Sequence, residues 1–244
     1  MPNLADLFDA YSRRARLYPV LLVTMPIGCS VVLLWPGLGW DKVAPIALAA
    51  GLPFFATSMI RSAGKRLEDR LVVEWDGMPT TRMLRLRDTA VNTELRRRRR
   101  AKLAALTGDP LPTADEEAAD PRRADECYVA AVRVLITKVR DDKDKHPRLH
   151  DENAEYGFRR NLLAAKPVAL VLLGALLVAD GVAVVLGRDI QAVGLAAAIH
   201  IVLILAWSLA VRRRWVTQQA NTYAERLFET LEHAAPATEA RPTT

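Results

Sequence analysis

The sequence has few cysteines and lacks the motifs of common enzymes. Its 244 residues include two cysteines, Cys29 and Cys127, which are too few for a disulfide framework. The sequence contains no glycine-rich phosphate loop, no nucleophile elbow and no paired-carboxylate motif. We therefore expect no catalytic residues, no cofactor and no enzymatic activity.

A metal site is also not expected. Two histidines, His146 and His150, lie close to Asp151 and Glu152. Their spacing matches none of the usual closed metal sites, and Pro147 interrupts any helix that would join the two histidines.

Apolar residues, in contrast, are abundant and are concentrated in four blocks. The blocks are Pro19–Trp40, Val43–Ile60, Pro167–Gly187 and Ile190–Val211. Each has 18 to 22 residues. A helix needs ~20 residues to cross the ~30 Å hydrocarbon core of a membrane. The sequence therefore predicts an all-α integral membrane protein with four transmembrane helices in two hairpins, at 19–60 and 167–211.

The distribution of Lys and Arg predicts the orientation. The turns within the hairpins offer only Lys42 and Arg188. The other ends of the spans are flanked by Arg13, Arg14, Arg16, Arg61, Lys65, Arg66, Arg70, Arg159, Arg160, Lys166, Arg212, Arg213 and Arg214. Positive charge near span ends favours the cytoplasmic side. We expect the protein to lie in a bacterial inner membrane, with both termini and the middle segment facing the cytoplasm.

The remaining segments divide as follows. Residues 1–18 form a cytosolic N-terminal segment, 61–166 a helical cytosolic domain inserted between the second and third spans, 212–234 a cytosolic helix, and 235–244 a Pro/Thr-rich tail expected to be disordered. Within the domain we predict helices over about Thr89–Leu106, from Thr113 in a capping box with Glu116, from Asp120-Pro121, and over about Asp151–Ala165.

Two ionisable residues interrupt the last two spans. Asp180 lies seven residues before Gly187, and His200 lies ten residues after Ile190. Helical side chains lean toward their own N-terminus, so on antiparallel helices these two lean toward each other. Ionisable residues inside a span usually face protein or water. Asp180 and His200 are therefore a pair that locks the hairpin or the lining of a proton or ion path. Two other interpretations are that Asp180 is protonated and has no further role, and that it reaches the outer headgroups.

Five consecutive arginines, Arg96, Arg97, Arg98, Arg99 and Arg100, form the strongest charge cluster outside the spans. They favour contact with anionic lipid headgroups or pairing with the acidic residues that follow. Nucleic acid is disfavoured because no aromatic residues alternate with the arginines.

The segment "WDGMPTTRMLRLR" permits two interpretations. If Thr80 or Thr81 caps a helix, its free N–H groups lie near Arg82 and Arg85, which predicts a site for a nucleotide or another anionic ligand. The same letters also fit an edge strand over Arg82–Arg87 without a ligand.

Three segments, "WDGMPTTRMLR", "HDENAEYGFRRN" and "AAKP", resemble parts of an uncharacterised bacterial family of membrane proteins with four spans. In architecture the chain also resembles small bacterial anti-phage membrane effectors with four helices, in which a cytosolic portion senses a signal and the membrane part leaks. No residue roles follow from either resemblance.

Together these observations favour a channel-like or membrane-permeabilising effector that is gated by its cytosolic domain. Four helices seldom enclose a pore, so we expect a homo-oligomer. A non-conducting membrane anchor that presents the domain to a partner, and a small transporter, stay open as alternatives.

Overall fold

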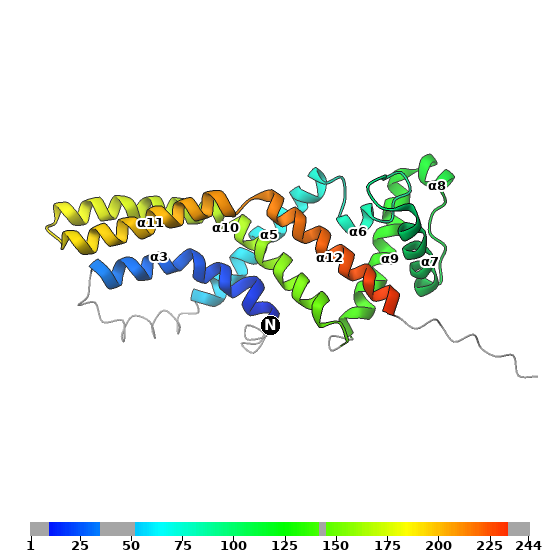
Figure 1. Cartoon of the computed structure of the whole chain (residues 1–244), viewed down its shortest axis with the longest axis horizontal. Helices are drawn as coiled ribbons and strands as arrows, with labels where there is room; N and C mark the ends of the chain where they lie inside the picture. Colours follow the sequence, from blue (N-terminus) through cyan, green and yellow to red (C-terminus); the bar gives the residue numbers. More distant parts are fainter. Residues whose placement is uncertain (1–9, 35–51, 142–144, 234–244) are drawn as a thin grey trace, which may run out of the picture. The chain divides into compact units, whose positions relative to one another are not determined.

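The computed structural model describes residues 10–34, 52–141 and 145–233. All regular structure in these ranges is helical, which confirms the all-α prediction (Figure 1). The chain divides into two compact units. Unit 1 contains Met1–Arg70 and Ala154–Gln219, and unit 2 contains Leu71–Asn153 and Ala220–Thr244. The segment 61–166, predicted as one cytosolic domain, is therefore shared between the two units.

Unit 1 is a bundle of long helices. It holds α2 (Ala10–Ser12), η1 (Arg13–Leu17), α3 (Tyr18–Leu34), most of α5 (Leu52–Glu74), most of α10 (Pro147–Val185), α11 (Ile190–Ala210) and the start of α12 (Arg213–His233). The predicted helix Asp151–Ala165 and the third predicted span are one continuous helix, α10, which contains Pro167. Proline is tolerated in membrane helices where neighbouring groups satisfy the backbone.

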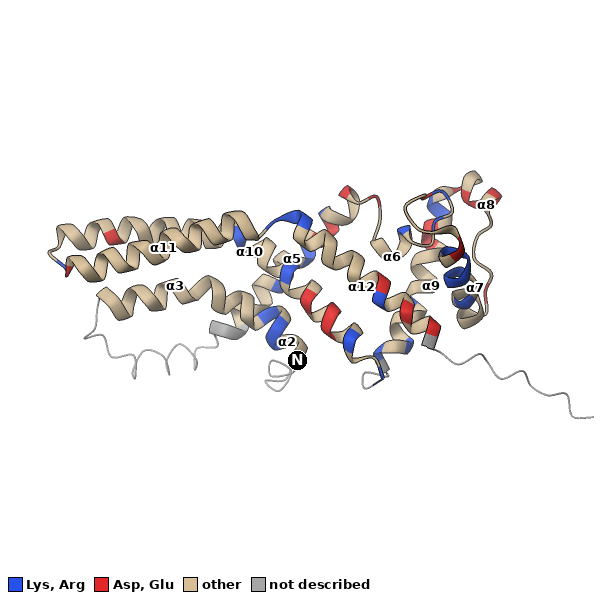
Figure 2. Ribbon diagram, in the orientation of Figure 1, with Lys and Arg blue, Asp and Glu red and all other residues tan. Residues whose placement is uncertain are grey.

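Three helices among the described residues are long and apolar enough to span a membrane. They are Arg13–Leu34, Pro147–Val185 and Ile190–Ala210, and they overlap the first, third and fourth predicted spans. At most 28% of the apolar window of each is buried inside the protein, so most of its apolar side chains face outward. Figure 2 shows that α3 and α11 carry no charged residues. Such a surface suits helices surrounded by hydrocarbon.

The second predicted span, Val43–Ile60, begins outside the described residues. From Leu52 the chain is helical as α5, which continues through a charged stretch to Glu74. The structure thus describes three candidate spans, and the first half of the second predicted span lies outside the described ranges.

The turn between α10 and α11 is closed at both helix ends. Gly187 adopts a left-handed conformation with φ +72°, and the N–H of Arg188 donates to the carbonyl of Ala183 at 3.0 Å. This is a Schellman end, in which glycine satisfies the last carbonyls of a helix. Asp189 then caps α11 by accepting hydrogen bonds from the backbone of Gln191 and Ala192. The hairpin is therefore fixed by backbone bonds.

A π-helical turn, η1, precedes α3. In this turn the N–H of Tyr18 donates to the carbonyl of Arg13, five residues earlier. The carbonyl of Ala15 accepts a hydrogen bond of 2.8 Å from Nδ2 of Asn161 on α10. The side chain of Asn161 thus ties the N-terminal segment to α10 at this irregular turn.

Unit 2 contains shorter helices with conventional ends. They are α6 (Pro79–Arg82), α7 (Thr93–Thr107), α8 (Ala114–Ala119) and α9 (Pro121–Asp141), with the first turns of α10 and the second half of α12. Thr113 and Glu116 form the predicted capping box, and Asp120 accepts from the backbone of Arg123. Gly108 ends α7 in a left-handed conformation, φ +78°.

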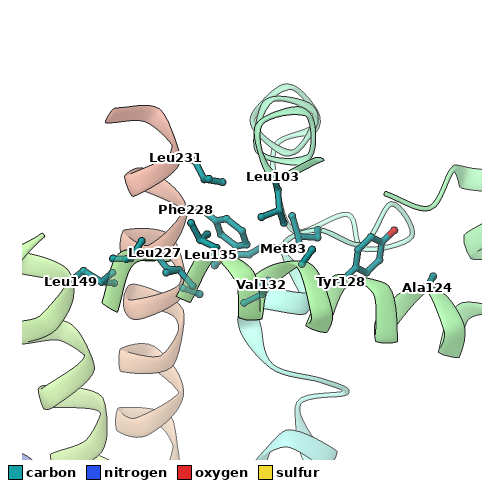
Figure 3. Close-up of a cluster of buried hydrophobic side chains, with 14 residues drawn as sticks. Met83, Leu103, Ala124, Tyr128, Val132, Leu135, Leu149, Leu227, Phe228 and Leu231 are labelled. Carbon is teal, nitrogen blue, oxygen red and sulfur yellow. The ribbon is translucent and has the colours of Figure 1, made fainter. Parts of the chain in front are cut away.

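A single apolar cluster joins these helices. Figure 3 shows Tyr128, Val132 and Leu135 of α9 beside Leu103 of α7 and Phe228 of α12. Both Tyr128 and Phe228 are fully buried. Burying side chains of this size contributes about 1.5–3 kcal/mol each for the apolar part. Unit 2 therefore has its own core.

Candidate functional site

Three buried polar side chains meet in unit 1, each from a different apolar helix. His200 of α11 lies between the other two: its Nδ1 is 2.6 Å from Oδ2 of Asp180 on α10. Its Nε2 is 3.0 Å from Oγ of Ser30 on α3. The exposed fractions are 4% for Ser30, 2% for Asp180 and 0% for His200. We call these three residues the polar relay.

The sequence predicted that Asp180 and His200 lean toward each other, and the structure places them within hydrogen-bonding distance. Their role stays a prediction. Ser30 was missed, although a signal was present: it lies four residues after Pro26 in the first span, where its hydroxyl donates to the Pro26 carbonyl at 3.0 Å. A serine at this position can also turn its single proton toward another acceptor.

The two hydrogen bonds within the relay can form with two different numbers of protons. With Asp180 ionised, Nδ1–H of His200 donates to the carboxylate, and the Ser30 hydroxyl donates to Nε2. With one more proton, both ring nitrogens of His200 donate, and the Ser30 hydroxyl turns to the Pro26 carbonyl. Each distance, at 2.6–3.0 Å, suits either direction of donation.

The second carboxylate oxygen of Asp180, Oδ1, gives the relay a further acceptor. Oδ1 is buried and accepts no hydrogen bond from the described residues. Buried polar atoms are usually satisfied, because an unpaired one costs about 1–3 kcal/mol. The relay therefore has an acceptor to spare for a proton or a cation.

Apolar clusters close the relay on both sides along the helices. Toward the α10–α11 turn lie Leu34, Ala183, Val193 and Ala196, each within about two turns of a relay residue. Toward the other end lie the buried residues Leu162, Ala165, Ala169, Leu173, Trp207 and Val211. We call these two groups the turn-side cluster and the base cluster. The relay is thus enclosed rather than open to either side.

A second polar group links α5 to α10 near the base of unit 1. Glu68 accepts hydrogen bonds from Tyr156 at 3.0 Å, from Lys65 at 2.6 Å and from the Arg160 guanidinium. Burial alone would raise the pKa of Glu68, but the charge of Arg160 and the bonds from Lys65 and Arg160 outweigh it and lower the pKa. These residues hold the helices together as an ion pair.

The predicted anion site in unit 2 has different geometry from that expected. Thr80 and Thr81 lie inside α6 and are buried, so the prediction that one of them caps a helix is wrong: Met78 is the N-cap, because Pro79 occupies the first position. The alternative strand over Arg82–Arg87 does not form either, since α6 includes Arg82 and turns follow it.

The two arginines of that site are engaged by carboxylates. Arg82 pairs with Asp88 at 3.3 Å. Arg85 is 4% exposed and makes two bonds to Asp125, at 2.9 and 2.7 Å, and one to Asp76 at 2.8 Å. The anion site here stays a prediction. In the structure, carboxylates of the same chain neutralise the charges of Arg82 and Arg85.

The arginine run splits between the interior and the surface. Arg96 and Arg99 are buried, and Arg96 donates to the carbonyls of Leu86 and Val91. Arg100 bonds the carbonyl of Leu84 and the hydroxyl of Tyr128. The exposed pair, Arg97 and Arg98, both bind Glu94. Lipid contact stays a prediction and concerns mainly Arg97 and Arg98.

Another buried carboxylate organises the same region. Glu117 accepts bonds from the backbone of Leu86 and Arg87, from the side chain of Arg87, and from the Tyr128 hydroxyl at 2.6 Å. Burial opposes its charge, yet these donors together lower the pKa of Glu117 to about 2. Nothing in the sequence around Glu117 distinguished it from its acidic neighbours.

Among the residues that the structure describes, no group of three or more His, Cys, Asp or Glu side chains is arranged to hold a metal ion. Comparisons with protein-family models, with curated proteins and with solved structures find no match for the chain. A function must therefore be argued from the geometry of its own residues.

Proposed function

We propose that the protein is a gated, channel-like membrane protein that moves protons or small cations through unit 1. The polar relay is the observation that carries this proposal. Three joined polar side chains, all at least 96% buried, lie within helices that are apolar enough to span a membrane. Ionisable groups placed so are costly, which makes a functional site the default hypothesis.

The enclosure of the relay favours gated movement over a permanently open pore. The turn-side cluster and the base cluster exclude water from both approaches. Hydrophobic constrictions of this kind can gate a channel by their dewetting. A proton delivered to the relay is retained there until one of the two clusters becomes hydrated.

The setting of this activity follows from the charges. The lysines and arginines that flank the spans support a cytoplasmic position for both termini and unit 2, at a bacterial inner membrane. The segment Val43–Ile60 supplies a fourth span, and several copies assemble around a common path. Unit 2, with its separate core, is the part that receives a gating signal.

A competing function is nucleophilic catalysis. Ser30, His200 and Asp180 are joined in the order of a Ser-His-Asp triad. Such catalysis needs N–H donors for an oxyanion. Ser30 lies within α3, whose neighbouring N–H groups are occupied by helix bonds, and it is 4% exposed. Failure of a fluorophosphonate probe to label Ser30 would agree with a proton site; labelling that His200→Ala abolishes would favour an enzyme.

The deciding experiment is proton flux from liposomes that contain the purified full chain, with a pH-sensitive dye inside and an imposed potential. Asp180→Asn keeps the shape of the side chain but removes the ionisable group, so we expect flux to fall to that of empty liposomes. Asp189→Asn in the same hairpin is the matched control, since asparagine also caps helices, and it should retain flux.

Two results would overturn the proposal. One is equal flux in wild type and Asp180→Asn. The other is no flux from wild type at any potential or pH, in protein shown to be folded and inserted. The second result would favour the non-conducting membrane anchor, with the relay as a structural lock.

A further inference from the structure

A basic cavity of about 350 Å³ lies within unit 2, at the start of α10. Its lining comes from two elements, the segment before and in the first turn of α10 and the second half of α12. The lining residues are Lys145, His146, Pro147, Arg148, Leu149, Arg226, Glu229 and Thr230. A volume of this size is at the lower end of small-molecule sites, which run from about 300 Å³.

The charge of this lining is mainly positive. Lys145, Arg148 and Arg226 face a single lining carboxylate, that of Glu229. One bond of 2.7 Å joins Nη1 of Arg226 to Glu229, and a guanidinium has five N–H donors, so others stay available. The hydrogen bond to Glu229 and its charge raise the pKa of Arg226, which keeps it charged.

The position at a helix start adds to this charge. Pro147 is the first residue of α10 and Arg148 the second. Pro147 has no N–H, and the N–H groups of Leu149 and His150 donate to the carbonyl of His146 at 3.1 and 3.3 Å, so the helix start contributes through its dipole, which favours an anion there. The cavity thus combines side-chain cations with the positive end of a 39-residue helix.

We infer that this cavity binds a ligand through one or two phosphate groups. Guanidinium and ammonium groups on two facing elements, together with a helix start, are the donors that phosphate oxygens bind most strongly. The cavity is partly open, and its volume fits a small phosphate-bearing group. It does not fit a duplex or an extended strand, which would need a long basic groove.

The cavity also has a consequence for the proposed function. One of its walls belongs to α10, the helix that carries Asp180, and the other to α12, which directly follows the helix of His200. A ligand that joins the two walls restrains both chain segments that lead to the relay. This regulatory consequence rests on the proposed proton flux, whereas the binding itself does not.

The test is binding of pyrophosphate to the full chain in phosphatidylcholine nanodiscs, measured by titration calorimetry. The probe variant is Lys145→Gln with Arg148→Gln; both side chains are exposed, so the fold should tolerate the change. The matched control is Arg122→Gln with Arg123→Gln. Arg122 likewise follows the first-position proline of a long helix, α9, but lines no part of this cavity.

We expect wild type and the control to bind alike, and the probe variant to bind more than tenfold more weakly, because it loses two charge-assisted contacts. Nanodiscs that contain phosphatidylglycerol distinguish the two possible sources of the phosphate group. If this lipid weakens pyrophosphate binding, the ligand is a lipid headgroup; if it does not, the ligand is a soluble phosphate compound. Asp180→Asn should bind as wild type does, which separates this inference from the flux.

Three outcomes would overturn the inference. They are no pyrophosphate binding by wild type in either membrane, equal binding by the probe variant, and an equal loss in the control. The last would mean that any helix start with two basic residues weakly attracts the anion, without a defined site.

Discussion

Asp180 and His200 are twenty residues apart in the sequence, and their side chains are 2.6 Å apart in the structure. The short turn at Gly187 brings α11 back along α10, and the lean of each side chain toward its own N-terminus closes the remaining gap. Ser30 reaches the other ring nitrogen of His200 from α3. The imidazole is therefore held at both nitrogens.

Removal of the Ser30 hydroxyl should uncouple the relay while leaving the bundle folded. Ser30→Ala leaves Nε2 of His200 without its partner and removes the acceptor switch to the Pro26 carbonyl. We expect a loss of about 1 kcal/mol in stability, since hydrogen bonds between membrane helices are worth about that much. Flux in liposomes should fall well below wild type. Unchanged flux would remove Ser30 from the path.

A polar residue in the base cluster should allow proton flux through unit 1 even when unit 2 receives no gating signal. Leu173 is 1% exposed and packs in that cluster, so Leu173→Asn introduces a group that water can bind. We expect higher basal flux in the liposome assay. Val171→Asn is the control, because Val171 lies on the same helix but is 74% exposed and faces outward. An increase in both variants would indicate general damage rather than a gate.

Replacing Arg85 should lower the stability of unit 2, whereas replacing Arg82 should change it little. Arg85→Ala removes two bonds to Asp125, which is partly exposed and keeps its two bonds from Arg87, so we expect a loss of about 1.5–3 kcal/mol, the range for hydrogen bonds to charged groups. Arg82→Ala should change stability by only about 0.5 kcal/mol, because Arg82 is partly exposed. Thermal unfolding of the two variants tests this. Loss of ligand binding is informative for the predicted anion site only in Arg82→Ala.

The stability of unit 2 should depend on pH through Glu117. Its folded pKa is about 2, below the ordinary value of 4.5, so the stabilisation is complete above pH 4.5 and is lost as the pH falls toward 2. Glu117→Gln should flatten this dependence. Hydrogen exchange at Leu86 and Arg87, whose N–H groups donate to Glu117, reports it locally. Exposed Glu126→Gln is the control, and an equally flattened profile there would contradict the assignment.

The sequence predicted the parts of the fold that depend on local pattern. The length of the apolar blocks located the three described candidate spans, and the caps at Thr113 and Asp120 lie where their residue types indicated. The same reasoning placed Asp180 and His200 on facing sides of a hairpin, because a helix of known rise and direction fixes where each side chain points.

What the sequence did not predict depends on contacts between distant segments. Ser30 joins His200 across 170 residues, and Glu68 meets Arg160 across 92. Arg85 and Glu117 are buried because carboxylates, arginines and backbone donors surround them in space. Charge patterns along the chain cannot show such partners, so the sequence left open whether Arg85 contacts a ligand, whereas the structure shows it paired with Asp125 and Asp76.

The π-helical turn η1 has a bearing on how this chain can vary in length. A single π turn accommodates one extra residue in an α-helix. Deleting one residue within Arg13–Leu17 would therefore convert the turn to regular helix and leave Ser30 facing His200, at the expense of the carbonyl that Asn161 binds. A deletion between Tyr18 and Ser30 would instead rotate Ser30 by about 100° away from His200. Natural variants of this chain should accordingly gain or lose residues before Tyr18 and keep a constant spacing from there to Ser30.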